Sequence, residues 1–270
     1  MSDLPENLSP YAERLGAWIA TYHYDHFAEA ARNLPLRRDV LTVLNYVREN
    51  KVIGTKSTGN MPLKHIRAVT AEFIDPPLLD QMIGEREYKL RTEFEVWPLF
   101  FIHVLTEAAD LLVTPEGGRW QLTPGGIRFL EGDPLLQVLS LFSAWWYRVD
   151  WRIALHIEAG ELPEGFPTST LAYLLAQPVG KWIELQDFTA VLNARTGLAT
   201  ALAKISGSGD WHQETKALNW DVRRMIAEPL VLFHVAEGRY LPQLPPPAGK
   251  RLTAFKISWF GKALLEGLNL

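Results

Sequence analysis

The chain has 270 residues, 47% of them hydrophobic and 21% charged, so it can bury one large core or two smaller ones. It contains no cysteine, which excludes disulfides, thiolate catalysis and zinc sites built on cysteine. Its formal net charge is -4. Any nucleic-acid binding would therefore need a local basic patch, because the average charge repels phosphate.

The first residues, Met1 to Asn7, lack the basic and apolar regions of a signal peptide. No apolar run in the sequence reaches the length needed to cross a bilayer. We therefore expect a cytoplasmic protein that has no membrane partner.

In chain order, residues 1–35 are predicted to be an N-terminal helical packing element, with apolar residues at helical spacing from 8 to 33 and a stop at Pro35. The next part covers residues 36–133. Its pattern predicts the following order: a helix from Leu36, a short strand at Val52-Ile53, a helix from Pro62, a helix over 92–109, and a hairpin with strands at 111–113 and 120–122.

Residues 134–167 are predicted to form a bridging segment, in which an apolar helix with several tryptophans is followed by a loop rich in glycine and proline. The last part covers residues 168–270. It is predicted to contain helices at 170–176, 183–192 and 220–232 and a longer hairpin, stiffened by prolines, over 233–258.

One phrase occurs twice, as Leu122-Thr-Pro-Gly-Gly-Ile-Arg-Phe-Leu-Glu-Gly132 and as Ile257-Ser-Trp-Phe-Gly-Lys-Ala-Leu-Leu-Glu-Gly267. In each copy a hydroxyl residue, Thr123 or Ser258, follows the end of a strand and can cap the helix after it. A glycine three residues later leaves room for close packing against the hairpin. The repeat predicts two winged-helix units.

Residues Lys56 to Lys64, Leu111-Leu-Val113 and Gly118 to Leu130, together with the tryptophan-rich helix after them, resemble the winged-helix repeats of bacterial helicase-associated proteins. These repeats are related to the N-terminal region of XPB-type repair helicases. The resemblance covers residues 36–151, and the last part of the chain only through its hairpin and final helix. It implies a mainly α fold with small β-hairpins (α+β), in which tandem winged helix-turn-helix units are joined by the tryptophan-rich helix.

Patterns typical of catalysis and cofactor binding are missing from the sequence. Gly180-Lys181 lacks the glycine spacing and the Ser or Thr of a nucleotide phosphate loop, and no helicase motor motif is present. His23 and His26 lie one helical turn apart without an identifiable third ligand, so we interpret them as packing or surface residues. No nucleophile elbow and no His-Glu-x-x-His motif occurs. We expect no enzyme activity, no metal and no cofactor.

Basic residues gather between Leu36 and Thr70, where seven of them stand against two acids, a local excess of five positive charges. This excess is the best electrostatic argument for DNA, although a solvated helix face would show the same pattern. Arg119 in the first hairpin and Arg223 and Arg224 in the third helix of the last part are further candidates. The candidate nucleic-acid contacts are therefore Arg37, Arg38, Lys56, Lys64, Arg67, Arg119, Arg223 and Arg224.

The third predicted helix of the first unit argues against base-specific recognition. Its residues Val96 to Leu105 are apolar on every side, which indicates a buried helix, and they offer no Arg, Asn or Gln to base edges. In the second unit Arg223 and Arg224 could enter a groove, or could be paired with nearby acids such as Asp221 and Glu228.

Two functional hypotheses remain open. In the first, the protein is a non-catalytic winged-helix protein that contacts the DNA backbone and has a regulatory or helicase-associated role. In the second, the fold is a docking module that has lost DNA contact and binds a protein partner or a second copy of itself. Affinity that falls steeply with salt would favour the first, and salt-independent self-association the second.

Overall fold

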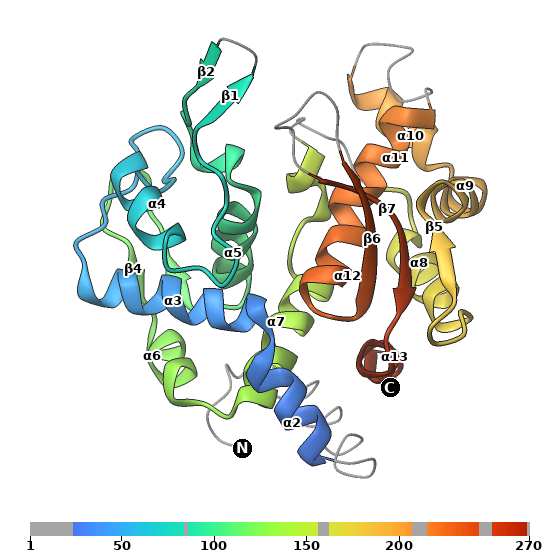
Figure 1. Cartoon of the computed structure of the whole chain (residues 1–270), viewed down its shortest axis with the longest axis horizontal. Helices are drawn as coiled ribbons and strands as arrows, with labels where there is room; N and C mark the ends of the chain where they lie inside the picture. The colour runs from blue at the N-terminus through green and yellow to red at the C-terminus, as the bar shows by residue number, and fades with distance from the viewer. Residues whose placement is uncertain (1–23, 84–85, 156–161, 207–214, 243–249, 269–270) are drawn as a thin grey trace. The chain divides into compact units, whose positions relative to one another are not determined.

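The computed structural model describes residues 24–83, 86–155, 162–206, 215–242 and 250–268, and it is mainly helical with small antiparallel sheets (Figure 1). The chain divides into two compact units, residues 1–149 and 150–270. The predicted N-terminal helix is present as α2 from Tyr24. Its earlier part, with His23, lies outside the described residues.

In the described part of the first unit, four helices precede the predicted hairpin and two follow it, and a strand pair lies between the third and fourth helices. Its elements are α2 (Tyr24–Asn33), α3 (Pro35–Glu49), α4 (Leu63–Thr70), β1 (Gln81–Ile83), β2 (Arg86–Tyr88), the 3-10 turn η1 (Glu93–Glu95), α5 (Trp97–Ala108), β3 (Leu112–Val113), β4 (Gln121–Leu122), α6 (Pro124–Glu131) and α7 (Pro134–Tyr147). The antiparallel pair β1–β2 was not predicted, because residues 75–91 show no clear alternation of apolar and polar residues.

The core of the first unit forms around α3 and α5. Helix α3 buries one face, including Val40, Leu44 and Val47, against α5, and it also packs on α4, α6 and β4. Helix α5 is buried on several sides, as its uniformly apolar sequence predicts. Helix α7, with Trp145 only 1% exposed, packs against α2 and α5. It therefore belongs to the first unit, which differs from the predicted bridge over 134–167.

A short stretch between α3 and α4 completes a small sheet with the hairpin. Strands β3 and β4 are antiparallel, with Leu112 opposite Leu122, and Ile53 forms an antiparallel bridge with Arg119. The amide of Trp120 donates to the carbonyl of Val52 at 3.0 Å. The second hairpin strand thus lies between the first hairpin strand and the stretch at Ile53.

The second unit also ends with a hairpin followed by a helix, and its hairpin strands are longer than those of the first unit. Its elements are the 3-10 turn η2 (Trp151–Leu155), α8 (Phe166–Leu175), β5 (Trp182–Glu184), α9 (Leu185–Thr196), α10 (Leu198–Ser206), α11 (Thr215–Val222), a π-helical segment (Arg223–Ala227), α12 (Glu228–Leu232), β6 (Ala236–Pro242), β7 (Lys250–Ile257) and α13 (Trp259–Leu268). The sheet has the order β5-β7-β6, so the second hairpin strand is again central.

Two sequence predictions for the second unit need correction. The helix expected from Ile183 begins at Leu185, because Trp182, Ile183 and Glu184 pair with β7 as a strand. Helix α10 was not predicted. The prolines at 245–247 and the glycine-serine stretch at 207–210 lie outside the described residues.

The repeated phrase caps a helix in the same way in both units. The hydroxyl oxygen of Thr123 accepts from the amide of Gly126 at 2.9 Å, and that of Ser258 accepts from the amide of Gly261 at 2.8 Å. Each hydroxyl also donates to the carbonyl of a residue with positive φ, Asp110 or His234. The two predicted caps are confirmed, and each ties a helix start to the turn before the hairpin.

Replacing Thr123 by alanine should lower the free energy of unfolding by about 1 kcal/mol, because the Gly126 amide loses its acceptor. The matched change Ser258→Ala should have a similar effect in the second unit. Urea denaturation gives both values, with Thr123→Ser, which keeps the hydroxyl, as control. An unchanged denaturation midpoint for Thr123→Ala would contradict this expectation.

Candidate nucleic-acid interface

The turn before α4 and the hairpin of the first unit are held together by hydrogen bonds. The amide of Gly117 donates to the carbonyl of Thr55 at 2.9 Å, and the indole Nε1 of Trp120 donates to the carbonyl of Gly59 at 2.8 Å. Gly59 has φ +71°, which favours glycine at this turn. The turn, the start of α4 and the tip of the hairpin therefore form one connected surface.

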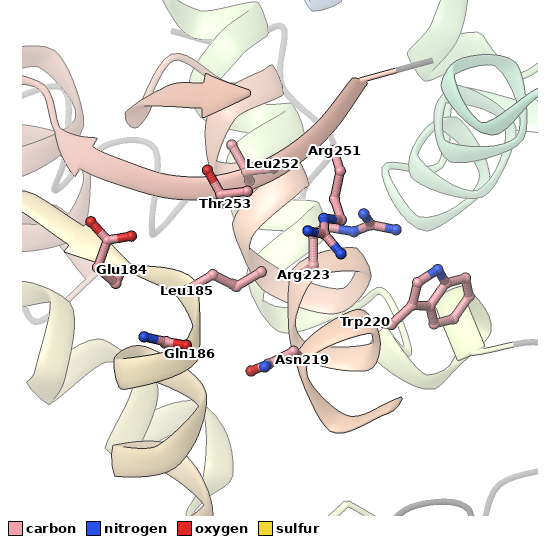
Figure 2. A pocket seen from close by; sticks show the side chains of 9 residues that line it. All are labelled: Glu184, Leu185, Gln186, Asn219, Trp220, Arg223, Arg251, Leu252 and Thr253. Atoms are coloured by element: carbon pink, nitrogen blue, oxygen red, sulfur yellow. The ribbon is translucent and has the colours of Figure 1, made fainter. Parts of the chain in front are cut away.

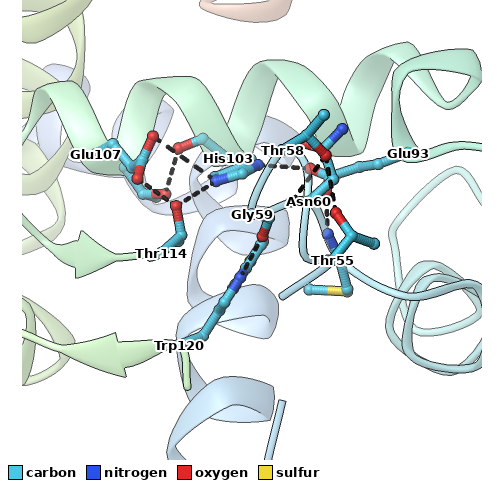
Figure 3. Close-up of polar contacts among 11 residues, drawn as sticks. Thr55, Thr58, Gly59, Asn60, Glu93, His103, Glu107, Thr114 and Trp120 are labelled. Carbon is cyan, nitrogen blue, oxygen red and sulfur yellow. Dashed lines mark hydrogen bonds and ion pairs between the residues drawn. The ribbon is translucent and has the colours of Figure 1, made fainter. Parts of the chain in front are cut away.

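A buried polar network connects this surface to α5 (Figure 3). The ring of His103, on α5, has its Nδ1 2.8 Å from a carboxylate oxygen of Glu93 and its Nε2 2.8 Å from the hydroxyl of Thr114. The second carboxylate oxygen of Glu93 accepts from the amide of Met61, next to α4. Both Glu93 and His103 are buried, at 1% and 5% exposure.

This network changes the interpretation of α5. Glu93, just before α5, lies in the interior, where its carboxylate contacts the Met61 amide and the His103 ring and does not face solvent. No sequence pattern predicts the network, since Glu93, His103 and Thr114 are about ten residues apart and match no motif. Helix α5 thus positions the turn and the hairpin instead of presenting side chains to a groove.

Four of the predicted DNA contacts are exposed and, within the described residues, make no ion pair: Arg38, Lys56, Lys64 and Arg119. Lys56 lies in the turn, with its Cα close to the hairpin at Gly117. Lys64 is on the first turn of α4, and Arg119 is on the hairpin opposite Ile53. The turn, α4 and the hairpin therefore carry three of these four cations.

Two other predicted contacts in the first unit already have partners. Arg67 forms a bidentate ion pair with Asp80, with distances of 2.7 and 2.8 Å, and this hydrogen bonding lowers the pKa of the Asp80 carboxyl. Arg37 donates from Nε to the side-chain oxygen of Gln137 and from Nη1 to the carbonyl of Arg32 at 3.2 Å. Burial lowers the pKa of the Arg37 guanidinium.

Arg38 lies beside a partly buried acid. Burial raises the pKa of Asp39 to about 6, although the amide of Ile74, which donates to this carboxylate at 2.9 Å, acts in the opposite direction. Arg37 and Arg38 also line a shallow depression with Arg32, while Glu72 lies on the same rim. The positive charge at this end of α3 is therefore partly offset by neighbouring carboxylates.

The second unit does not present its predicted arginine pair to solvent. Arg223 is 7% exposed and lies 3.3 Å from a carboxylate oxygen of Glu228, and Arg224 lies 3.2 Å from the other oxygen. Arg224 also stacks on Trp220, with 5.5 Å between the guanidinium carbon and the ring centre. The sequence left open either a groove contact or pairing with acids, and this geometry favours pairing for both residues.

Within the described ranges, no group of three or more His, Asp or Glu side chains is placed to hold a metal ion. None of the described helices combines the length and the apolar character that a membrane span requires. A comparison of the chain with protein-family models, with curated proteins and with solved structures found no match.

Proposed function

We propose that the protein associates with DNA as a non-catalytic tandem winged-helix protein that contacts the phosphate backbone. The observation that carries this proposal is the shared order of the two units. In each, a strand or bridge after the first helix pairs with the second strand of a hairpin, and a capped helix follows the hairpin. Winged-helix proteins have this order: a helix, a strand, two helices and two hairpin strands. The second hairpin strand is central in their sheet.

The charge distribution supports backbone contact in the first unit. Lys56, Lys64 and Arg119 are exposed on the turn, the second helix and the hairpin, which are elements that winged-helix proteins place against DNA phosphates. Helix α5 is buried and its acids are engaged in the unit, so base edges would not be read by it. The expected binding is weak and nearly independent of DNA sequence.

Fluorescence anisotropy with a mixed-sequence duplex at several salt concentrations tests the proposal. The logarithm of the affinity should fall with the logarithm of salt concentration by about 0.9 for each phosphate neutralised. Replacing Lys56, Lys64 and Arg119 together by alanine should lower this slope by about 2.7, if each contacts one phosphate. Folding should be almost unaffected, because exposed cations contribute little to stability.

The matched control removes three exposed arginines of the same unit that lie outside the turn and the hairpin, namely Arg48, Arg91 and Arg128. This control should change the slope much less than the triple variant. Adding Arg67→Ala to Lys64→Ala should change the slope less than the loss of a cation that contacts phosphate, because Arg67 is already engaged in an ion pair with Asp80. Absence of binding at low salt, or equal slopes for the two triple variants, would contradict backbone contact by this surface.

A docking function is the second candidate, and apolar exposure in the second unit favours it. Val179, Trp182 and Trp259 are 51%, 41% and 52% exposed. Trp182 pairs with Lys256 in the sheet, and the amide of Gly180 donates to the carbonyl of Ile257, so the three apolar side chains belong to neighbouring stretches of one unit. A dimer that persists at high salt and is lost in Trp259→Ser would favour this second function.

A further inference from the structure

The second unit contains a cavity of about 340 Å³ between the start of α9, helix α11 and strand β7 (Figure 2). Leu185 and Leu252 form the apolar part of its wall. The other residues that line it are polar, charged or aromatic: Glu184, Gln186, Asn219, Trp220, Arg223, Arg251 and Thr253. The cavity lies entirely within this unit.

Two guanidinium groups meet at one side of the cavity. Arg223 comes from the π-helical segment after α11 and Arg251 from β7, and Figure 2 shows their guanidinium groups next to each other. Their proximity is also evident in the pKa of Arg223: burial lowers it most, Glu228 raises it, and the charges of Arg224 and Arg251 lower it. Two like charges in one cavity repel each other unless an anion lies between them.

The carboxylate of Glu228 does not balance this charge. It is shared between Arg223 and Arg224, and within the described residues Arg251 has no ion pair, so the two guanidinium groups at the cavity are not both neutralised. The Nε of Arg223 is buried without a hydrogen-bond partner, although a Glu228 oxygen lies 3.3 Å away. Glu184, the acid on the opposite side of the cavity, is paired with Arg239.

The cavity depends on features that distinguish the second unit from the first. Strands β6 and β7 have 7 and 8 residues, whereas β3 and β4 have 2 each, and Arg251, Leu252 and Thr253 lie on the added length of β7. The π-helical segment begins at Arg223, and such segments inside helices frequently occur at functional sites.

We propose that this cavity binds a small phosphate monoester, with its phosphate between Arg223 and Arg251. A phosphate anion would compensate the repulsion between the two guanidinium groups, and arginine is suited to bind phosphate oxygens through paired N–H groups. The cavity is larger than a phosphate ion needs, and Leu185 and Leu252 offer an apolar surface to the organic part. Gln186, Asn219 and Thr253 supply hydrogen-bonding groups around it. Phosphate-ester binding at this site does not depend on DNA binding.

Isothermal titration calorimetry of the full chain, without DNA, tests the site. The probes are ribose 5-phosphate and adenosine 5′-monophosphate, their dephosphorylated forms ribose and adenosine, and inorganic phosphate. At least one phosphate ester should bind, its dephosphorylated form should not, and inorganic phosphate should bind more weakly at the same site. Arg251→Gln, which changes an exposed side chain, should weaken binding of the ester about tenfold or more.

The matched control is Lys256→Gln, which removes one positive charge from the same strand outside the cavity and should leave the affinity within about twofold. The proposal is overturned if neither ester binds at concentrations up to about 10 mM. It is also overturned if the dephosphorylated compounds or inorganic phosphate bind as tightly as the esters, or if Arg251→Gln and Lys256→Gln weaken binding equally. Circular dichroism of each variant verifies that the fold is intact.

Discussion

Replacing Gly261 by alanine is expected to lower the free energy of unfolding by about 3 kcal/mol, one of the largest effects of a single methyl group in this chain. An added Cβ at this position would lie 1.9 Å from the carbonyl oxygen of Val235. That oxygen also accepts from the amide of Ser258 at 3.0 Å. Because the obstacle is backbone, α13 would have to move away from β6 to make room.

The same change in the first unit, Gly126→Ala, is expected to have a comparable effect, because its Cβ would lie 2.2 Å from the carbonyl oxygen of Leu111. Gly132→Ala is the control: its φ is -72° and its nearest contact would be 3.3 Å, so alanine should be tolerated. Urea denaturation measures all three variants. A denaturation midpoint for Gly261→Ala no lower than that for Gly132→Ala would show that the close contact does not destabilise the variant.

These contacts also explain why the helix caps of the repeated phrase could be predicted from the sequence. A helix cap depends on residues within three positions of each other, so Thr123 and Ser258 could be assigned from local chemistry alone. The need for glycine at 126 and 261 followed from the same local pattern. Helices α3, α4 and α5 were likewise predictable, because their apolar spacing reports which face is buried.

The candidate interface was predictable only in part, because a sequence shows charges but not the distances between them. Lys56, Lys64 and Arg119 are exposed as expected, whereas Arg67 reaches Asp80 across 13 positions. Arg223 is buried because the helix continues through it into the core of the second unit. Such pairings depend on tertiary packing, which no local pattern of charge determines.

The cavity in the second unit was missed for a related reason. Arg251 follows a stretch rich in proline, which suggested a stiff hairpin loop and nothing more. Arg251 pairs with Leu241 near the start of β7, and this strand packs beside the segment that contains Arg223. The two arginines are 28 positions apart in sequence, so only the fold brings them to one cavity.

Replacing His103 by leucine is expected to destabilise the first unit by about 3 kcal/mol. His103 is the partner of the buried carboxylate of Glu93, which would keep only the amide of Met61 as a hydrogen-bond donor (Figure 3). Breaking a buried pair by removing one partner costs more than the pair contributes when intact, because an uncompensated charge remains. Urea denaturation of the variant and of the natural chain measures the loss.

The control is Thr114→Val, which removes one hydroxyl from the other side of the His103 ring and leaves Glu93 with its partner. It should cost about 1 kcal/mol, because the hydroxyl loses its contact with His103 and a hydrogen bond to Glu107, and the second of these is exposed to solvent. A cost for His103→Leu no greater than that for Thr114→Val would mean that the network does not hold the interior of this unit. The expected ranking would instead identify α5 as the support that fixes the turn and the hairpin, and with them Lys56 and Arg119.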